Sequence, residues 1–170
     1  KAYYMAKESS LSRLIQNWEG ARGSMRNPKV VLSSLTSKAQ DEAYVFERLY
    51  RNLYNTEFYL EAYAKLYPNK GSNTKGTNND TIDGMSLDRI ERLIEKLKEQ
   101  TYQPNPARRT YIPKKNGKKR PLGIPTFEDK LVQEVVRRVL DSIYEPQFSD
   151  HSHGFRPNRS CHTALKEIRN

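Results

Sequence analysis

The sequence has only one cysteine, Cys161, among 170 residues. A single cysteine rules out an internal disulfide framework and is typical of a reducing compartment. No apolar run approaches the roughly 18 residues of a membrane span, and residues 30–32 are typical of the longest. The first residues also lack the apolar stretch of a secretory signal. We therefore expect a cytoplasmic protein with no membrane partner.

Apolar residues are in short supply, at 35% of the sequence, with a mean hydropathy of -0.93. This composition supports one thin core, and the length allows one domain or slightly more. We expect exposed faces that a partner completes.

Acidic residues are fewer than basic ones: the sequence has 20 Asp and Glu against 30 Lys and Arg, which gives a net charge of +10. Residues 101–127 contain no acidic residue, and they hold seven cations: Arg108, Arg109, Lys114, Lys115, Lys118, Lys119 and Arg120. Such clustering favours binding to a polyanion, most simply a nucleic acid, over a solvated basic loop.

The N-terminal half is predicted to be helical. Residues 1–36 are interpreted as a leader with a short amphipathic helix at 11–18. The capping-box pattern at 37–40, followed by apolar residues at helical spacing, predicts a helix to about Tyr54. A second helix is predicted from about residue 56 to Tyr67, before Pro68. The tyrosines of this region favour packing over base stacking.

Residues 69–80 have the composition of a loop without apolar residues. Lys70, Lys75 and backbone amides could hold phosphate there, and a plain linker is the equal alternative. Ser86 then predicts the start of a surface helix over 87–99.

Two short strands, 108–114 and 120–125, flank an Asn-Gly turn signal and predict a projecting hairpin. Thr126 and Asp129 predict the start of the main core helix, which Pro146 ends. Ser160 is a suitable cap for a final helix.

Three ordered segments resemble the reverse transcriptases encoded by group II introns. They are residues 111–126 (YIPKKNGKKRPLGIPT), 128–133 (EDKLVQ) and 153–165 (HGFRPNRSCHTAL). Residues 70–76 with Asp83-Gly84 resemble the N-terminal extension of that family, so the resemblance covers about 37–170.

The resemblance implies an α+β fold: the mostly helical fingers of a right-hand polymerase, with a projecting hairpin, cut off at the start of the palm. It divides the chain into a leader (1–36), a helical extension and fingers (37–100), and hairpin, core helix and start of palm (101–170). In the family, Mg²⁺ is held by palm carboxylates that include a Tyr-x-Asp-Asp signature. That signature is absent from these 170 residues, so we expect no catalytic or metal-binding residue here and no activity from the chain alone.

The resemblance also assigns site residues. Arg108, Lys114 and Arg120 would bind the triphosphate of the incoming deoxynucleotide. RNA would be contacted by a larger set: Lys70, Lys75, Arg109, Lys115, Lys118, Lys119, Arg156 and Arg159. The implied partners are intron RNA, template RNA, primer DNA and the rest of the palm, while self-association stays open.

The hairpin loop has to satisfy a geometric condition. A two-residue Asn116-Gly117 loop would place Lys114 and Arg120 on opposite faces of the ribbon. A three-residue loop, 115–117, with Gly117 in the left-handed region, puts Arg108, Lys114 and Arg120 on one face. We predict the three-residue loop.

The sequence also allows two alternative interpretations. A zinc site around His151, His153, Cys161 and His162 has no common ligand spacing. A non-enzymatic RNA-binding module that assists intron splicing is the rival function, because the same basic surface would serve it.

Overall fold

The computed structural model describes residues 26–69 and 71–169. The leader helix expected at 11–18 and the side chain of Lys70 therefore lie outside the described residues. The helices are α2 (Pro28–Lys38), α3 (Thr56–Leu66), α4 (Leu87–Lys98), α5 (Phe127–Tyr144) and α6 (Cys161–Arg169). The strands are β1 (Arg108–Pro113) and β2 (Lys119–Ile124), and short 3-10 helices lie at Leu49–Tyr54 (η1), Ile82–Gly84 (η2) and Glu145–Gln147 (η3). Across the described residues, helices combined with an antiparallel hairpin confirm the predicted α+β class.

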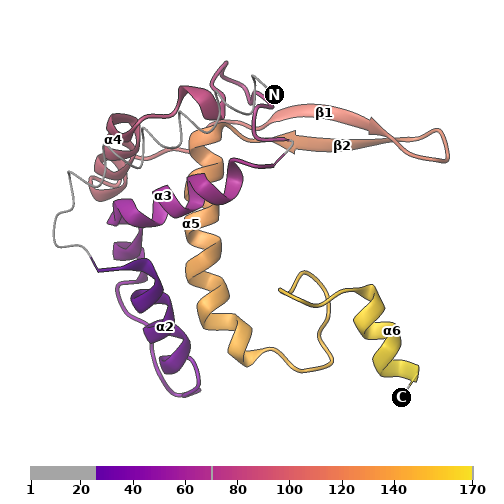
Figure 1. Cartoon of the computed structure of the whole chain (residues 1–170). Helices are drawn as coiled ribbons and strands as arrows, with labels where there is room; N and C mark the ends of the chain where they lie inside the picture. The colour runs from indigo at the N-terminus through magenta and orange to yellow at the C-terminus, as the bar shows by residue number, and fades with distance from the viewer. Residues whose placement is uncertain (1–25, 70, 170) are drawn as a thin grey trace.

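Helix α5 is the axis of the molecule, as expected for the strongest apolar pattern in the chain (Figure 1). Thr126 caps it by accepting a hydrogen bond from the amide of Asp129 at 3.4 Å. Leu131 and Val135 of its apolar stripe are fully buried, whereas Leu140 near its C-terminal end is 41% exposed. Helices α2, α3 and α4 lie on one side of this axis, and the hairpin leaves from its N-terminal end (Figure 1).

The core joins α3, α4 and α5, and tyrosines of α3 fill much of it. Tyr59 and Tyr63 are almost fully buried. The Tyr59 hydroxyl donates to the Leu53 carbonyl at 3.0 Å and the Tyr63 hydroxyl to the Ile82 carbonyl at 3.4 Å. Burial therefore raises the pKa of Tyr59. The packing interpretation is confirmed for these tyrosines.

The helix predicted over 37–54 is wrong. The helix of this region, α2, begins at Pro28 behind the cap Asn27, whose side chain accepts from the amide of Lys29, and it ends at Lys38. Asp41 then accepts a hydrogen bond from the amide of Ala43, which fixes a turn. The chain continues without regular structure until η1 at Leu49.

Helix α4 agrees with its prediction. Ser86 accepts a hydrogen bond from the amide of Arg89 at 3.3 Å. The apolar stripe of the helix is buried at Ile90, Leu93, Ile94 and Leu97. This stripe fastens the helical layer that supports the base of the hairpin.

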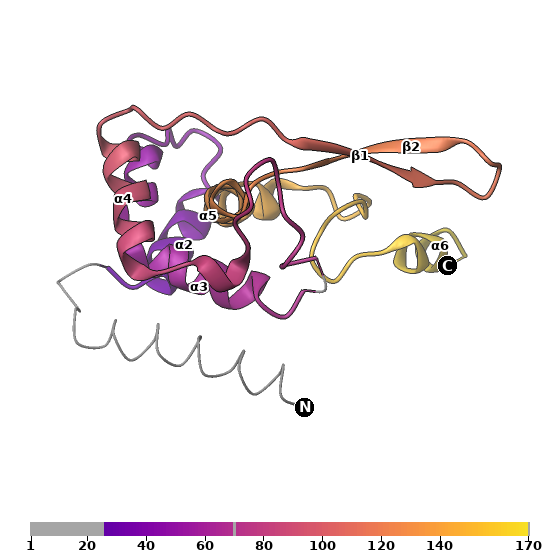
Figure 2. The same ribbon diagram turned by 90° about the horizontal axis from the view of Figure 1, so that it is seen from above.

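The C-terminal segment extends from the far end of α5 and ends in α6, which has no buried residue. Seen from above, the hairpin and α6 both extend away from the helical layer (Figure 2). Among residues 26–69 and 71–169, no helix combines the length and apolarity needed to cross a bilayer.

Candidate nucleotide and nucleic-acid interface

The register of the hairpin confirms the predicted three-residue loop. Ile112 pairs with Arg120 and Pro113 with Lys119. The Lys114 amide donates to the Lys118 carbonyl at 2.7 Å, which leaves residues 115–117 as the loop. Gly117 has a φ of 78°, the left-handed conformation that this loop requires.

This register separates the basic residues between two faces. Side chains directly opposite each other share a face, and successive residues alternate. Arg120, opposite Ile112, therefore shares a face with Arg108 and Lys114. Arg109 and Lys119 lie on the other face.

The base of the hairpin is held by Asp129, a carboxylate with only 1% exposure. It accepts a hydrogen bond from the Tyr102 hydroxyl at 2.5 Å and from the Asn105 amide at 3.2 Å, both on the segment that enters β1. It also accepts from the Thr126 hydroxyl at 2.5 Å, just after β2. Burial and the bond to Asp129 raise the pKa of Tyr102. The Asp129 carboxylate thus links the segment before β1 and the segment after β2 to α5.

The loop that was predicted at 69–80 lies against this same base. Gly76 is so close to Thr126 that an added Cβ would come within 2.8 Å of its backbone. The Thr77 hydroxyl donates to the Pro106 carbonyl at 3.0 Å, and Arg108 Nε donates to the Lys75 carbonyl at 3.0 Å. These contacts make the described part of the loop a docked element, which argues against the plain linker.

Arg89 of α4 fastens the end of that loop. Its Nη2 lies 2.6 Å from both Asp80 of the loop and Glu128 of α5. Its Nη1 donates to the Gly84 carbonyl at 3.1 Å. The hydrogen bond to Asp80 raises the pKa of Arg89, and burial opposes it. Loop, α4 and α5 are thereby joined at one guanidinium.

Most of the predicted contact residues are free to meet a ligand. Within the described part of the chain, six basic side chains of the hairpin have no hydrogen bond or ion pair: Arg109, Lys114, Lys115, Lys118, Lys119 and Arg120. All of them are exposed. Arg108 differs, since its Nε is bound to the Lys75 carbonyl, which positions its guanidinium beside the loop.

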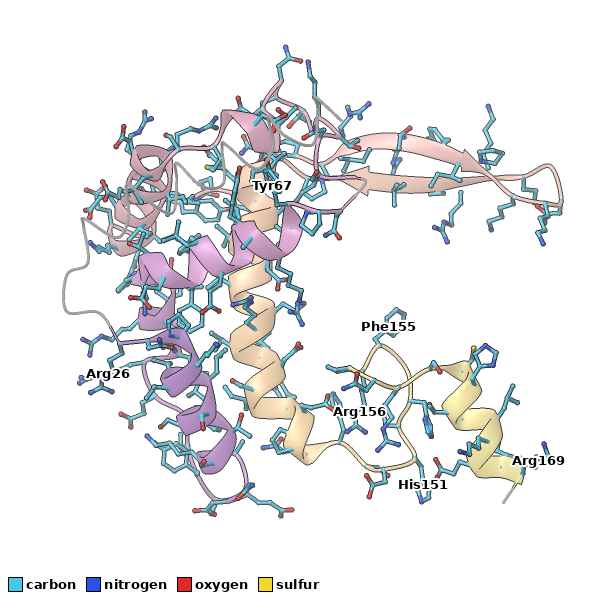
Figure 3. The ribbon with its side chains drawn as sticks, in the orientation of Figure 1. Arg26, Tyr67, His151, Phe155, Arg156 and Arg169 are labelled. Atoms are coloured by element: carbon cyan, nitrogen blue, oxygen red, sulfur yellow. The ribbon has the colours of Figure 1, made fainter. Side chains whose placement is uncertain are left out.

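Arg156 lies in the segment before α6, away from the hairpin (Figure 3). Arg159 follows it in the same segment. The Arg156 guanidinium pairs with Glu145 at 2.9 Å and donates to the carbonyls of Ser149 and Ser152. Its side chain is only 8% exposed. Arg159 pairs with Asp150 at 3.2 Å. Arg156 therefore holds its own loop in shape, whereas Arg159 remains partly exposed.

The histidines of this segment pair with one carboxylate. Glu167 of α6 contacts His151, and its second oxygen lies 2.5 Å from His153 Nε2. These contacts lower the pKa of Glu167, the hydrogen bond from His151 being the larger cause. No three His, Cys, Asp or Glu side chains within residues 26–69 and 71–169 are grouped as metal ligands.

Similarity to known proteins agrees with this geometry. Residues 112–170 match the family described as reverse transcriptase (RNA-dependent DNA polymerase). The group II intron-encoded protein LtrA of Lactococcus lactis subsp. cremoris is 55% identical over 85% of this chain and 24% of its own length. An uncharacterized 91 kDa protein in the cob intron of Schizosaccharomyces pombe is 48% identical over 79% of this chain and 17% of its own. A mitochondrial nuclear intron maturase 1 of Arabidopsis thaliana is 47% identical over 26% of this chain and 6% of its own.

The family match begins at residue 112 and therefore includes β2 and the end of β1. The basic hairpin and the helices that follow it are thus part of a reverse transcriptase. Within that class, the chain belongs to the reverse transcriptases encoded by group II introns. It spans about a quarter of the length of the LtrA relative.

Proposed function

We propose that this chain is the fingers portion of an RNA-directed DNA polymerase and maturase, with residues 37–100 as extension and fingers and 101–170 as hairpin, core helix and start of the palm. It binds intron and template RNA, beside the primer DNA, and holds the incoming deoxynucleotide. The family membership supports this role, and so does a hairpin that carries basic side chains on both of its faces.

The observation that carries the nucleotide part of the proposal is the register. It brings Arg108, Lys114 and Arg120 to one face of a ribbon whose base is fastened by Asp129. Three cations on a rigid support can orient a triphosphate and stabilise the charge that develops on the leaving pyrophosphate. Arginine adds bidentate contacts and lysine a compact charge.

RNA phosphates are assigned to the remaining exposed cations: Lys75, Arg109, Lys115, Lys118, Lys119 and Arg159, with Lys70 proposed from sequence alone. Arg156 is proposed to position its own loop, because its guanidinium is already bound there.

The divalent ions of the reaction need carboxylates close to each other. Among the described residues, no three His, Cys, Asp or Glu side chains are grouped so that they could hold a metal ion. We propose that Mg²⁺ is bound by palm carboxylates outside this sequence.

The test is Arg120→Ala in the full-length enzyme. Losing a charge-assisted contact worth about 1.5–3 kcal/mol should lower nucleotide incorporation about tenfold to a hundredfold. Splicing assistance should fall less, because it depends on RNA binding. Arg109→Ala is the matched control, since it removes the same charge from the other face; at saturating template it should leave incorporation nearly intact.

The opposite pattern would refute the proposal. Unchanged incorporation with lost splicing in the Arg120 variant would remove the triphosphate role and leave the RNA-binding module as the function.

A further inference from the structure

The second face of the hairpin carries an aromatic ring among free cations. Tyr111 lies opposite Pro121, and the alternation of the strands places Arg109 on the same face, two residues before it. Lys119, opposite Pro113, lies on this face on the other side of Tyr111. The order along the face is therefore cation, ring, cation.

This ring is available to a ligand. Tyr111 is 56% exposed. It makes no ring contact or hydrogen bond with another described residue, unlike the tyrosines of α3. Every residue from 111 to 123 is exposed, and no helix lies against the outer part of the ribbon in either view (Figures 1 and 2).

The two faces differ in chemistry. Beside Arg120 the first face presents aliphatic side chains, Ile112 opposite it and Leu122 farther along. The second face presents the flat tyrosine ring, with Pro121 opposite it on the facing strand. Aromatic rings with neighbouring cations are the means by which proteins hold single-stranded nucleic acid: bases stack on the ring and phosphates meet the cations. A duplex hides the faces of its bases, so only a single strand can use the ring.

We propose that the face formed by Arg109, Tyr111 and Lys119 binds single-stranded RNA, with one base stacked on Tyr111. The absence of any acidic residue from 101 to 127 gives this face an unopposed positive charge, which matches the phosphate backbone. The inference deepens the proposed function and rests on it, since it assigns an RNA strand and the nucleotide to opposite faces of one ribbon.

The experiment measures binding of this chain to a short fluorescent single-stranded RNA and to a blunt RNA duplex. Tyr111→Ala should weaken single-strand binding roughly 5-fold to 100-fold and leave duplex binding almost unchanged, since stacking contributes about 1–3 kcal/mol per base. Tyr111→Phe should bind like the unmodified chain. Ile112→Ala, the neighbouring exposed residue on the other face, is the matched control and should have no effect.

A second readout reports stacking directly. A 2-aminopurine base in the single strand should lose fluorescence on binding to the unmodified chain and to Tyr111→Phe, and keep it with Tyr111→Ala. Circular dichroism of each variant verifies folding.

The outcomes distinguish failure of base stacking on Tyr111 from failure of RNA binding as a whole. Equal single-strand affinity of the unmodified chain and Tyr111→Ala would overturn this inference and leave the proposed function standing. An equal loss for the duplex, or full competition by polyglutamate, would also overturn it, because general charge would then explain binding. Failure of the unmodified chain to bind any RNA would overturn the proposed function as well.

Discussion

At the scale of single residues, Glu134 shows how a thin core tolerates a charge. Its side chain is 8% exposed on α5, and one oxygen lies 2.8 Å from both Lys65 of α3 and Arg137. Burial alone would raise its pKa, but hydrogen bonds from Arg137 and Lys65 outweigh burial and lower the pKa from 4.5 to about 2. The ion pair between Lys65 and Glu134 joins α3 to α5.

Replacing Glu134 by Gln should destabilise the chain at neutral pH by about 1–3 kcal/mol, because Lys65, Arg137 and Arg138 each lose a charged partner. A carboxylate with a lowered folded-state pKa stabilises the fold above its unfolded pKa of 4.5, and this contribution is lost as pH falls through about 2. The difference between the two proteins should therefore shrink from pH 4.5 downward. Urea unfolding at several pH values measures it.

Glu95→Gln is the matched control for this experiment. Glu95 pairs with Lys98 on α4, but it is 60% exposed, and an exposed pair contributes little. A pH-independent difference for the Glu134 variant would show that its effect comes from packing and not from charge.

Residues whose role depends on distant neighbours could not be predicted from the sequence. Asp129 is visible there only as part of a capping pattern, yet it also binds Tyr102 and Asn105, 27 and 24 positions away. Arg89 looks like an ordinary surface arginine until the loop and α5 come within reach of it. Such contacts leave no periodic signal, because they arise only after the chain has folded.

At the scale of elements, the loop at 71–80 depends on one close backbone approach. Gly76→Ala should force the loop away from Thr126, because the added Cβ would lie 2.8 Å from two backbone atoms that cannot move easily. We expect a loss of about 1–3 kcal/mol in unfolding free energy, with weaker RNA binding. Thermal unfolding and RNA titration measure the two effects.

Gly71→Ala provides the comparison on the same loop. Nothing lies within 4 Å of a Cβ at Gly71, so this variant should match the unmodified chain. Equal behaviour of the two alanine variants would contradict the docked arrangement of the loop.

Elements with a strong local signal were predictable and the others were not. The three-residue hairpin loop was predictable from the Asn-Gly signal together with the expectation that three cations share a face, and the left-handed Gly117 confirms the loop. The helix predicted at 37–54 was wrong, although apolar residues such as Phe46 and Leu49 have the spacing of a buried helix face. They reach the small cluster around Val139 and Ile143 from an irregular segment and η1 instead. Periodicity reports which residues are buried and leaves open how the backbone brings them there.

At the scale of the whole molecule, the described residues form a support with a basic ribbon and no grouped metal ligands. We expect the chain alone to show no nucleotide incorporation with template, primer, deoxynucleotides and Mg²⁺, because gripping a triphosphate does not replace the metal ions. A primer-extension assay checks this, with the full-length enzyme as the positive control. Incorporation above background that Arg120→Ala abolishes would show that the chain carries its own catalytic carboxylates.

Binding of RNA by the chain should depend steeply on salt. The six cations proposed to contact RNA in the described residues are exposed or partly exposed: Lys75, Arg109, Lys115, Lys118, Lys119 and Arg159. RNA phosphates therefore replace small counterions at these side chains when RNA binds. Six such contacts at about −0.7 each give a slope of about −4 in log K against log salt, a loss of roughly 10²-fold to 10³-fold between about 50 and 200 mM. Changing Arg109, Lys115, Lys118 and Lys119 to Gln should reduce the slope by about three, whereas Lys98→Gln, on α4, should leave it unchanged. An affinity that stays flat over this range would mean that contacts other than phosphate hold the RNA, and the basic ribbon would then need another role.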